Sequence, residues 1–154
     1  MSPHESILHL PALLPQIAER LTISVDPYTL RFRRPAKTSR GEYETKQVYY
    51  LRLQSLEQAG HVGCGECAPM PQLSCDDLPH YQAVLEQLAG QMVQAPDRFD
   101  VASLRPYPSI AFGLATAINS FISAGHSSEE GSEKPFCDTP VSYTHLTLPT
   151  TERV

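Results

Sequence analysis

Apolar and polar residues alternate in three runs near the start of the chain, and these runs predict three β-strands. They cover residues 21–34, 45–56 and 61–68, and short links join them. Successive side chains of a strand point to opposite faces, so a period of two indicates a sheet with one buried face. Short links between neighbouring strands predict an antiparallel meander. The step Asp26-Pro27 breaks the phase of the first run, and we expect a β-bulge there.

Downstream of the strands, the spacing of apolar residues becomes helical. One stripe recurs every three or four residues: Leu78, Tyr81, Leu85, Leu88 and Met92. It predicts a helix over 75–93, and Ser74 with Asp77 forms a capping-box variant at its start. Pro108 suits the first position of a second helix over 108–124. Strands followed by helices predict an α+β fold with the helices packed on one face of the sheet.

Glycine alternates with larger residues in the third predicted strand. Gly63 and Gly65 leave one face of it almost bare, so another backbone can approach closely. Cys64 and Cys67 are three residues apart and point to opposite faces of a strand, so their sulfurs do not converge on one metal ion. We therefore expect no metal or redox site at this pair. The four cysteines of the chain are consistent with reduced thiols in a cytosolic protein.

Length and charge exclude several classes of protein. The 154 residues suit one domain with a modest core. A net charge of −5 argues against a nucleic-acid partner. The local exception is a basic cluster that we interpret as a solvated strand end: Arg31, Arg33, Arg34, Lys37 and Arg40. No apolar run approaches the roughly 20 residues that span a bilayer, so we expect no membrane partner.

The first twenty residues are rich in leucine, and two prolines interrupt them. They carry no basic n-region, so a signal peptide is not expected and we predict a cytoplasmic protein. The pattern leaves two alternatives open for residues 1–20: a short docking helix or an upstream extension.

Three segments carry the most specific pattern. The first is Gly63–Pro71, which contains the motif Gly-x-Gly-Glu-x-x-Pro. The second is the Thr-Ser-Arg-Gly loop within Pro35–Gly41, and the third is the Tyr-Pro-Ser-Ile helix start at Tyr107. Together they resemble the N-terminal capping domain of the enolase superfamily, of the mandelate racemase and muconate lactonizing enzyme type. The combination is most similar to the o-succinylbenzoate synthase branch. The resemblance covers residues 21–125.

The resemblance implies an activity that this chain does not contain by itself. In the family, the cap closes one mouth of a (β/α) barrel, whose strands supply Mg²⁺ ligands and the lysines that remove the proton α to a carboxylate. The resemblance to the o-succinylbenzoate synthase branch implies dehydration by a carbon-oxygen lyase in menaquinone biosynthesis. No barrel strand is recognisable, so we expect an inactive cap fragment that has no catalytic residue and binds no metal. Caps of dipeptide epimerases or muconate-type cycloisomerases, and a stand-alone binding module, remain alternatives.

For the cap, the resemblance implies recognition of a small carboxylate substrate by two loops. The implied substrate-binding residues are Thr38, Ser39, Arg40, Met70 and Leu73. The Arg40 guanidinium can pair bidentately with a carboxylate, and pairing with a surface acid such as Glu42 or Glu44 is the alternative. Met70 and Leu73 can pack against an apolar ring or serve as plain interface residues. The oligomeric state stays open.

The last part of the chain departs from the family pattern. Residues 126–140 suggest a polar linker that ends at the start of a barrel. Residues 141–154 resemble the translation of a sequencing-library adaptor, so we expect a tail without function and a reading frame cut by an assembly error.

Overall fold

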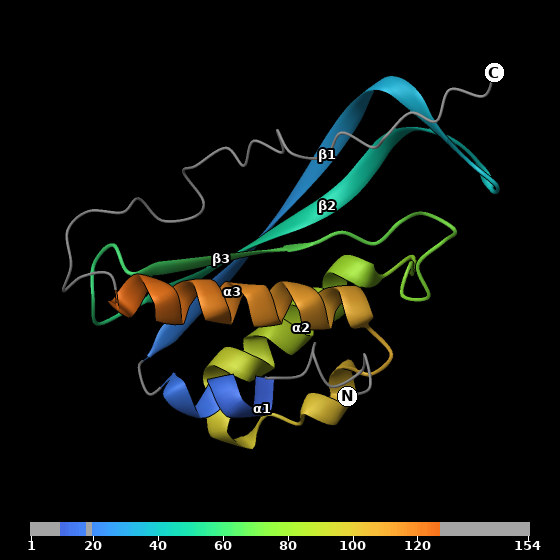
Figure 1. The fold of residues 1–154 in the computed structure, drawn as a ribbon. Coiled ribbons are helices and arrows are strands. Elements are labelled where there is room, and N and C mark those ends of the chain that lie inside the picture. The colour runs from blue at the N-terminus through green and yellow to red at the C-terminus, as the bar shows by residue number, and fades with distance from the viewer. Residues whose placement is uncertain (1–9, 18–19, 127–154) are drawn as a thin grey trace, which may run out of the picture.

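The computed structural model describes residues 10–17 and 20–126, and one layer of strands lies on one layer of helices (Figure 1). In chain order the elements are α1 (Leu10–Leu13), η1 (Leu14–Gln16), β1 (Leu21–Thr38), β2 (Gly41–Ser55), β3 (Val62–Cys67), α2 (Tyr81–Gln94), η2 (Pro96–Arg98), η3 (Val101–Leu104) and α3 (Pro108–His126). The expected linker and the adaptor-like tail, from residue 127 on, lie outside the described residues.

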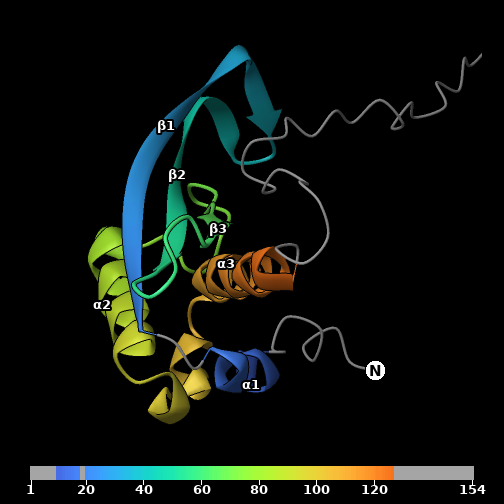
Figure 2. The same ribbon diagram turned by 90° about the vertical axis from the view of Figure 1, so that its left-hand side faces the viewer.

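The three strands form an antiparallel sheet in the order β1-β2-β3, which confirms the predicted meander and the α+β fold. β1 and β2 are longer than predicted, since they continue past the end of β3 as a twisted two-stranded arm (Figure 2). The predicted strands missed only the end of the arm, residues 35–38 and 41–44, because these residues are mostly charged or polar and show no apolar alternation.

The β-bulge predicted at Asp26-Pro27 is wrong. The pairing of β1 with β2 is continuous from Leu21 to Arg31, and the register shifts between Arg31 and Ala36 instead. A proline is tolerated here because β1 is an edge strand. Asp26 and Pro27 are both exposed. The loss of apolar alternation therefore marks the place where β1 leaves the core, not an extra residue in the ladder.

Helix α3 lies directly against β3, backbone to backbone. A Cβ added at Gly63 would lie 2.3 Å from the carbonyl oxygen of Ala117, and one at Gly65 would lie 2.2 Å from that of Gly113. Real Cβ atoms do not approach so closely, so only glycine fits at these two positions. The close approach predicted from the glycine pattern is confirmed.

The core fills the space between the sheet and the helices. Its fully buried side chains include Leu51 and Leu53 of β2, Leu85 and Met92 of α2, and Ile110, Leu114 and Ile118 of α3. Leu10, Leu14 and Ile17 belong to the same cluster. Within the first twenty residues the structure describes 10–17, and there it shows a short helix, α1, docked on the core. Among the described helices, none combines the length and the apolar character that crossing a membrane requires.

Helix α2 begins later than the sequence predicted. It starts at Tyr81, and the residue before it, His80, makes no side-chain capping bond. Ser74 caps no helix, because its hydroxyl accepts a hydrogen bond from the backbone N–H of Met70 at 2.8 Å. Pro79 explains the late start, since a proline disfavours helical geometry in the residue before it. The start of α3 at Pro108 is confirmed.

Candidate functional site

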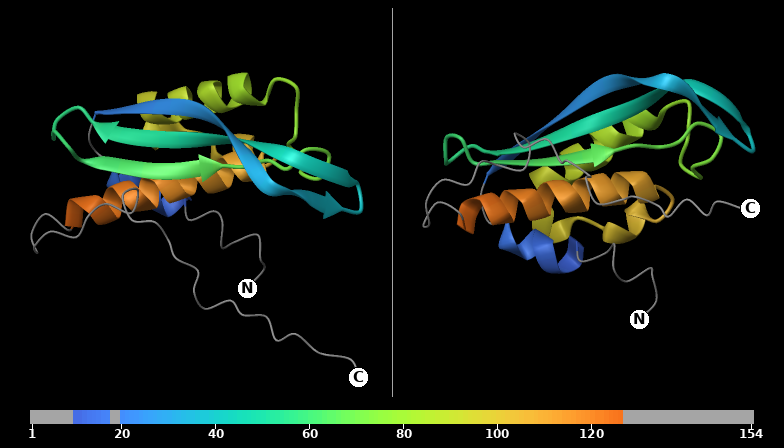
Figure 3. Two further views of the ribbon diagram at one scale, coloured as in Figure 1. Left: turned by 90° about the horizontal axis from the view of Figure 1, so that it is seen from above. Right: turned by 45° about the horizontal axis from the view of Figure 1, so that its top comes forward.

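Two segments far apart in the sequence lie side by side at one end of the sheet. They are the turn at the tip of the arm, residues 38–41, and the loop that follows β3, residues 68–80 (Figures 1 and 3). Arg40 Nη1 donates to the carbonyl oxygen of Gln72 at 3.3 Å, and the Tyr43 hydroxyl donates to the carbonyl oxygen of Pro71 at 3.0 Å. We call these two hydrogen bonds the clasp.

The arm turn is held by its own polar groups. The Thr38 hydroxyl donates to the carbonyl oxygen of Gly41 at 3.2 Å and accepts from the backbone N–H of Arg40 at 3.2 Å. Gly41 has a φ of +147°, in the region that favours glycine. Ser39 is exposed at the tip. Thr38 therefore shapes the turn, while Ser39 and Arg40 present their side chains outward.

Arg40 is exposed and keeps most of its hydrogen-bonding capacity. A guanidinium has five N–H donors, and the clasp uses one of them. Glu42, which the sequence offered as an alternative partner, lies 3.8 Å from the ammonium of Lys37. The structure thus directs Arg40 to the neighbouring loop and leaves Glu42 with a different cation.

The loop after β3 is a tight turn. The backbone N–H groups of Leu73 and Ser74 both donate to the carbonyl oxygen of Met70, at 3.1 and 3.0 Å. Gln72 has a φ of 60°, in the left-handed region, where any residue with a Cβ has a higher conformational free energy. Its N–H donates to Asp77 Oδ2 at 2.8 Å. Met70 is partly buried, and Leu73 is 44% exposed, which is high for a leucine.

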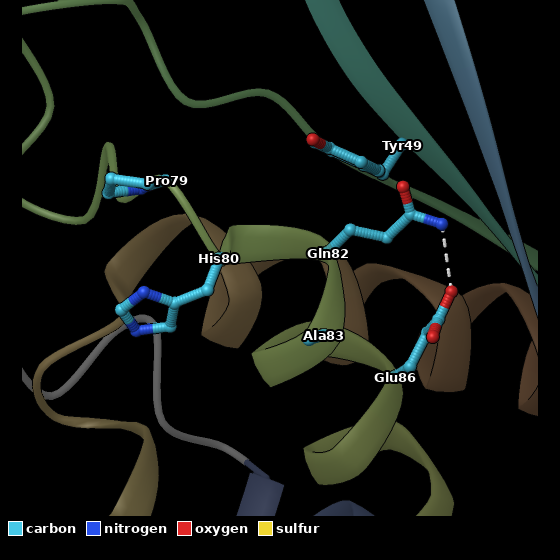
Figure 4. Close-up of a pocket in the computed structure, with 6 residues that line it drawn as sticks. All are labelled: Tyr49, Pro79, His80, Gln82, Ala83 and Glu86. Atoms are coloured by element: carbon cyan, nitrogen blue, oxygen red, sulfur yellow. Dashed lines mark hydrogen bonds between the residues drawn. The ribbon is translucent and has the colours of Figure 1, made fainter.

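A separate hollow of about 390 Å³ lies between β2 and the first turns of α2 (Figure 4). It is lined by Tyr49, Pro79, His80, Gln82, Ala83 and Glu86. The Gln82 amide donates to the Glu86 carboxylate at 2.8 Å, so these two groups satisfy each other. Burial, with a smaller contribution from Asp77, raises the pKa of the Tyr49 hydroxyl above its ordinary value. None of the predicted site residues lines this hollow, and we assign it no ligand.

The described residues do not offer the donor set of a magnesium site. Among residues 10–17 and 20–126, no three histidine, cysteine, aspartate or glutamate side chains come together. Mg²⁺ prefers carboxylate oxygens in octahedral geometry, so this part of the chain does not fit the ion. Cys64 is disulfide-bonded, so the expectation of four reduced thiols is wrong for this residue. Cys67 and Cys75 are free thiols.

The structure brings the five predicted site residues to one end of the molecule, on the arm turn and the facing loop. Sequence reasoning missed three residues that hold this arrangement: Tyr43, Gln72 and Asp77. Asp77 carried a signal, but we read it as part of a helix start. Gln72 takes part through its backbone, which no side-chain pattern reveals.

Comparison with known proteins places the chain in a family. Residues 36–121 match the family described as "MenC, N-terminal domain". The structure is similar to that of a mandelate racemase/muconate lactonizing protein from Herpetosiphon aurantiacus, with a TM-score of 0.54 and 18% identity over 70% of this chain and 32% of that one. Such a likeness shows the fold. A comparison with curated protein sequences finds no match.

A second solved structure is more similar in sequence. It is the o-succinylbenzoate synthase from Thermosynechococcus elongatus BP-1, complexed with magnesium in its active site, with a TM-score of 0.50 and 29% identity over 64% of this chain and 29% of that one. The chain thus spans about a third of the length of these solved proteins. The family match covers more than half of the chain, and the chain belongs to the MenC N-terminal domain family of the enolase superfamily.

Proposed function

We propose that residues 21–125 form the substrate-specificity cap of an o-succinylbenzoate synthase-like lyase, an enzyme that removes the proton α to a carboxylate and then eliminates water. The family match and the 29% identity to the enzyme from Thermosynechococcus elongatus support this assignment. The metal ligands and the base would come from outside the described residues, so the chain alone is expected to be inactive. The substrate would be a small-molecule carboxylate.

The observation that carries the proposal is the clasp between the arm turn and the loop. It holds the exposed guanidinium of Arg40 against the carbonyl oxygen of Gln72, the residue before the exposed Leu73. A substrate that bears both a carboxylate and an apolar ring matches these two groups. The guanidinium would pair with the carboxylate, and Leu73 with Met70 would cover the ring. Ser39 offers a further hydroxyl at the tip.

The experiment is a chimera in which residues 21–125 replace the N-terminal domain of the Thermosynechococcus elongatus enzyme. We expect this protein to dehydrate the o-succinylbenzoate precursor, and the isolated 154-residue chain to give no turnover above background in the same assay. A parallel chimera carries a muconate-type cycloisomerase barrel. If only that second chimera is active while both melt cooperatively, the lyase assignment is wrong.

A further inference from the structure

A buried carboxylate ties the loop after β3 to the start of α3. Asp76 is 1% exposed, and its Oδ2 accepts from the backbone N–H of Ser109 at 2.8 Å and from the Ser109 hydroxyl at 2.5 Å. Ser109 is the second residue of α3, so its N–H has no partner within the helix. The helix dipole also favours a negative charge at this end. These contacts offset part of the cost of burying Asp76, whose Oδ1 has no hydrogen-bond partner among the described residues.

The same network reaches both ends of the loop. The Ser109 hydroxyl gives its proton to Asp76, so the Tyr81 hydroxyl, 2.6 Å away, donates to Ser109 Oγ. Tyr81 also lies near the Cys67 thiol, and each of the two groups influences the pKa of the other. Cys67 is the last residue of β3 and Tyr81 the first of α2, so the network joins the residues that flank the loop. Burial raises the pKa values of both groups, that of Cys67 to about 12, so both stay protonated at neutral pH.

The hydrogen-bonded pair of Asp76 and Ser109 connects to the clasp through adjacent residues. Asp77 follows Asp76 and accepts from the N–H of Gln72, and the carbonyl oxygen of Gln72 accepts from Arg40. Gln72 is held in the left-handed conformation, which persists only where the surroundings determine it. Each link in this path is a hydrogen bond or a peptide bond, from the first turn of α3 to the tip of the arm.

We propose that Asp76, held by Ser109 at the start of α3, is a positioning residue that fixes the loop of residues 68–80 and thereby presents Arg40 and Leu73 in one arrangement before a substrate binds. The effect of Asp76 on substrate recognition rests on the proposed function, whereas its effect on the conformation of the loop does not. Asp76 is buried and Ser109 is partly buried, and neither would touch the substrate.

Hydrogen exchange of backbone amides, followed by NMR on the 154-residue chain, tests the positioning directly. In Asp76→Ala and Ser109→Ala we expect the amides of residues 72–74 to exchange about ten-fold faster or more, while those of β2 residues 51–53 change less than about two-fold. A role in global stability alone would speed both sets by the same factor. Either that result or unchanged exchange of residues 72–74 overturns the proposal.

Matched variants keep the test decisive. Ser109→Thr retains the hydroxyl and should restore slow exchange. Ser103→Ala removes a similar hydroxyl bond, to the carbonyl oxygen of Asp100 at 2.6 Å in η3, and should leave residues 72–74 unchanged. If Asp76→Ala does not fold, Asp76→Asn keeps one acceptor oxygen, and we expect it to give an intermediate rate.

The chimera separates this inference from the proposed function. There, Asp76→Asn is expected to raise KM about five-fold with kcat within about two-fold, because the recognition groups lose their fixed placement. Suppose that the chimera has no activity while residues 72–74 exchange faster in the Asp76→Ala and Ser109→Ala variants. This result refutes the proposed function and supports the positioning role of Asp76. An active chimera whose KM and loop exchange ignore Asp76→Asn and Ser109→Ala refutes the positioning alone.

Discussion

The contact of β3 with α3 and the clasp between the arm turn and the loop both join two elements, but they are built differently. At the first contact two backbones touch, and no atom can be added at Gly63 or Gly65. At the clasp, two side chains reach backbone carbonyls, and Arg40 is exposed. The first contact depends on the absence of side chains, and the second on which side chains are present. If the proposed function holds, we therefore expect stability and recognition to change independently in this fold.

The largest effect should come from adding one methyl group to the first contact. Gly65→Ala places a Cβ 2.2 Å from the carbonyl oxygen of Gly113, so α3 must move away from β3. We expect a loss of about 3 kcal/mol or more in the free energy of unfolding, measured by urea denaturation. Gly90→Ala in α2 is the control, because its Cβ meets nothing within 4 Å. That variant should gain up to about 1 kcal/mol.

Alkaline pH should weaken the same contact. Burial raises the pKa of Cys67 from 9.0 to about 12, so the folded state holds this proton more tightly than the unfolded state. The stabilisation from this proton is complete only below about pH 9 and is lost as the pH rises toward 12, by about 3 kcal/mol at pH 11. Denaturation curves at pH 8 and 11 measure it. Cys67→Ala should remove most of the pH dependence of the free energy of unfolding, and Cys75→Ala should remove none. If the free energy of unfolding changes equally with pH in both variants, this account is wrong.

A smaller effect of opposite sign is expected at the loop. Gln72 has a φ of 60°, so Gln72→Gly relieves backbone strain and should raise the free energy of unfolding by about 1 kcal/mol. Gly60→Ala is the converse control. Gly60 has a φ of +86° with open space around it, so strain alone should cost about 1 kcal/mol. Thermal melts compare the stability of both variants with that of the parent protein. If Gln72→Gly is less stable than the parent, Gln72 is not strained.

The two regions also differ in how far the sequence predicted them. The close contact of β3 with α3 followed from Gly63 and Gly65, because a strand face without side chains lets another backbone approach closely. The partner of Arg40 did not follow, because its acceptor is a backbone carbonyl, which every residue has. Ser74 and Asp77 suit a helix start and a polar loop equally well, and Pro79 decides between them. The end of the arm, residues 35–38 and 41–44, was missed because its exposed strands carry no apolar period.

The central claim is that the clasp serves recognition while the core supplies stability, and Arg40→Ala in the chimera tests it most directly. Arg40 is exposed and gives one hydrogen bond to Gln72, so its loss should lower the free energy of unfolding by less than about 1 kcal/mol. Loss of a charged partner for a carboxylate should lower kcat/KM about ten-fold or more, mainly through KM. The account predicts this fall in kcat/KM at a nearly unchanged Tm. An unchanged kcat/KM would contradict it.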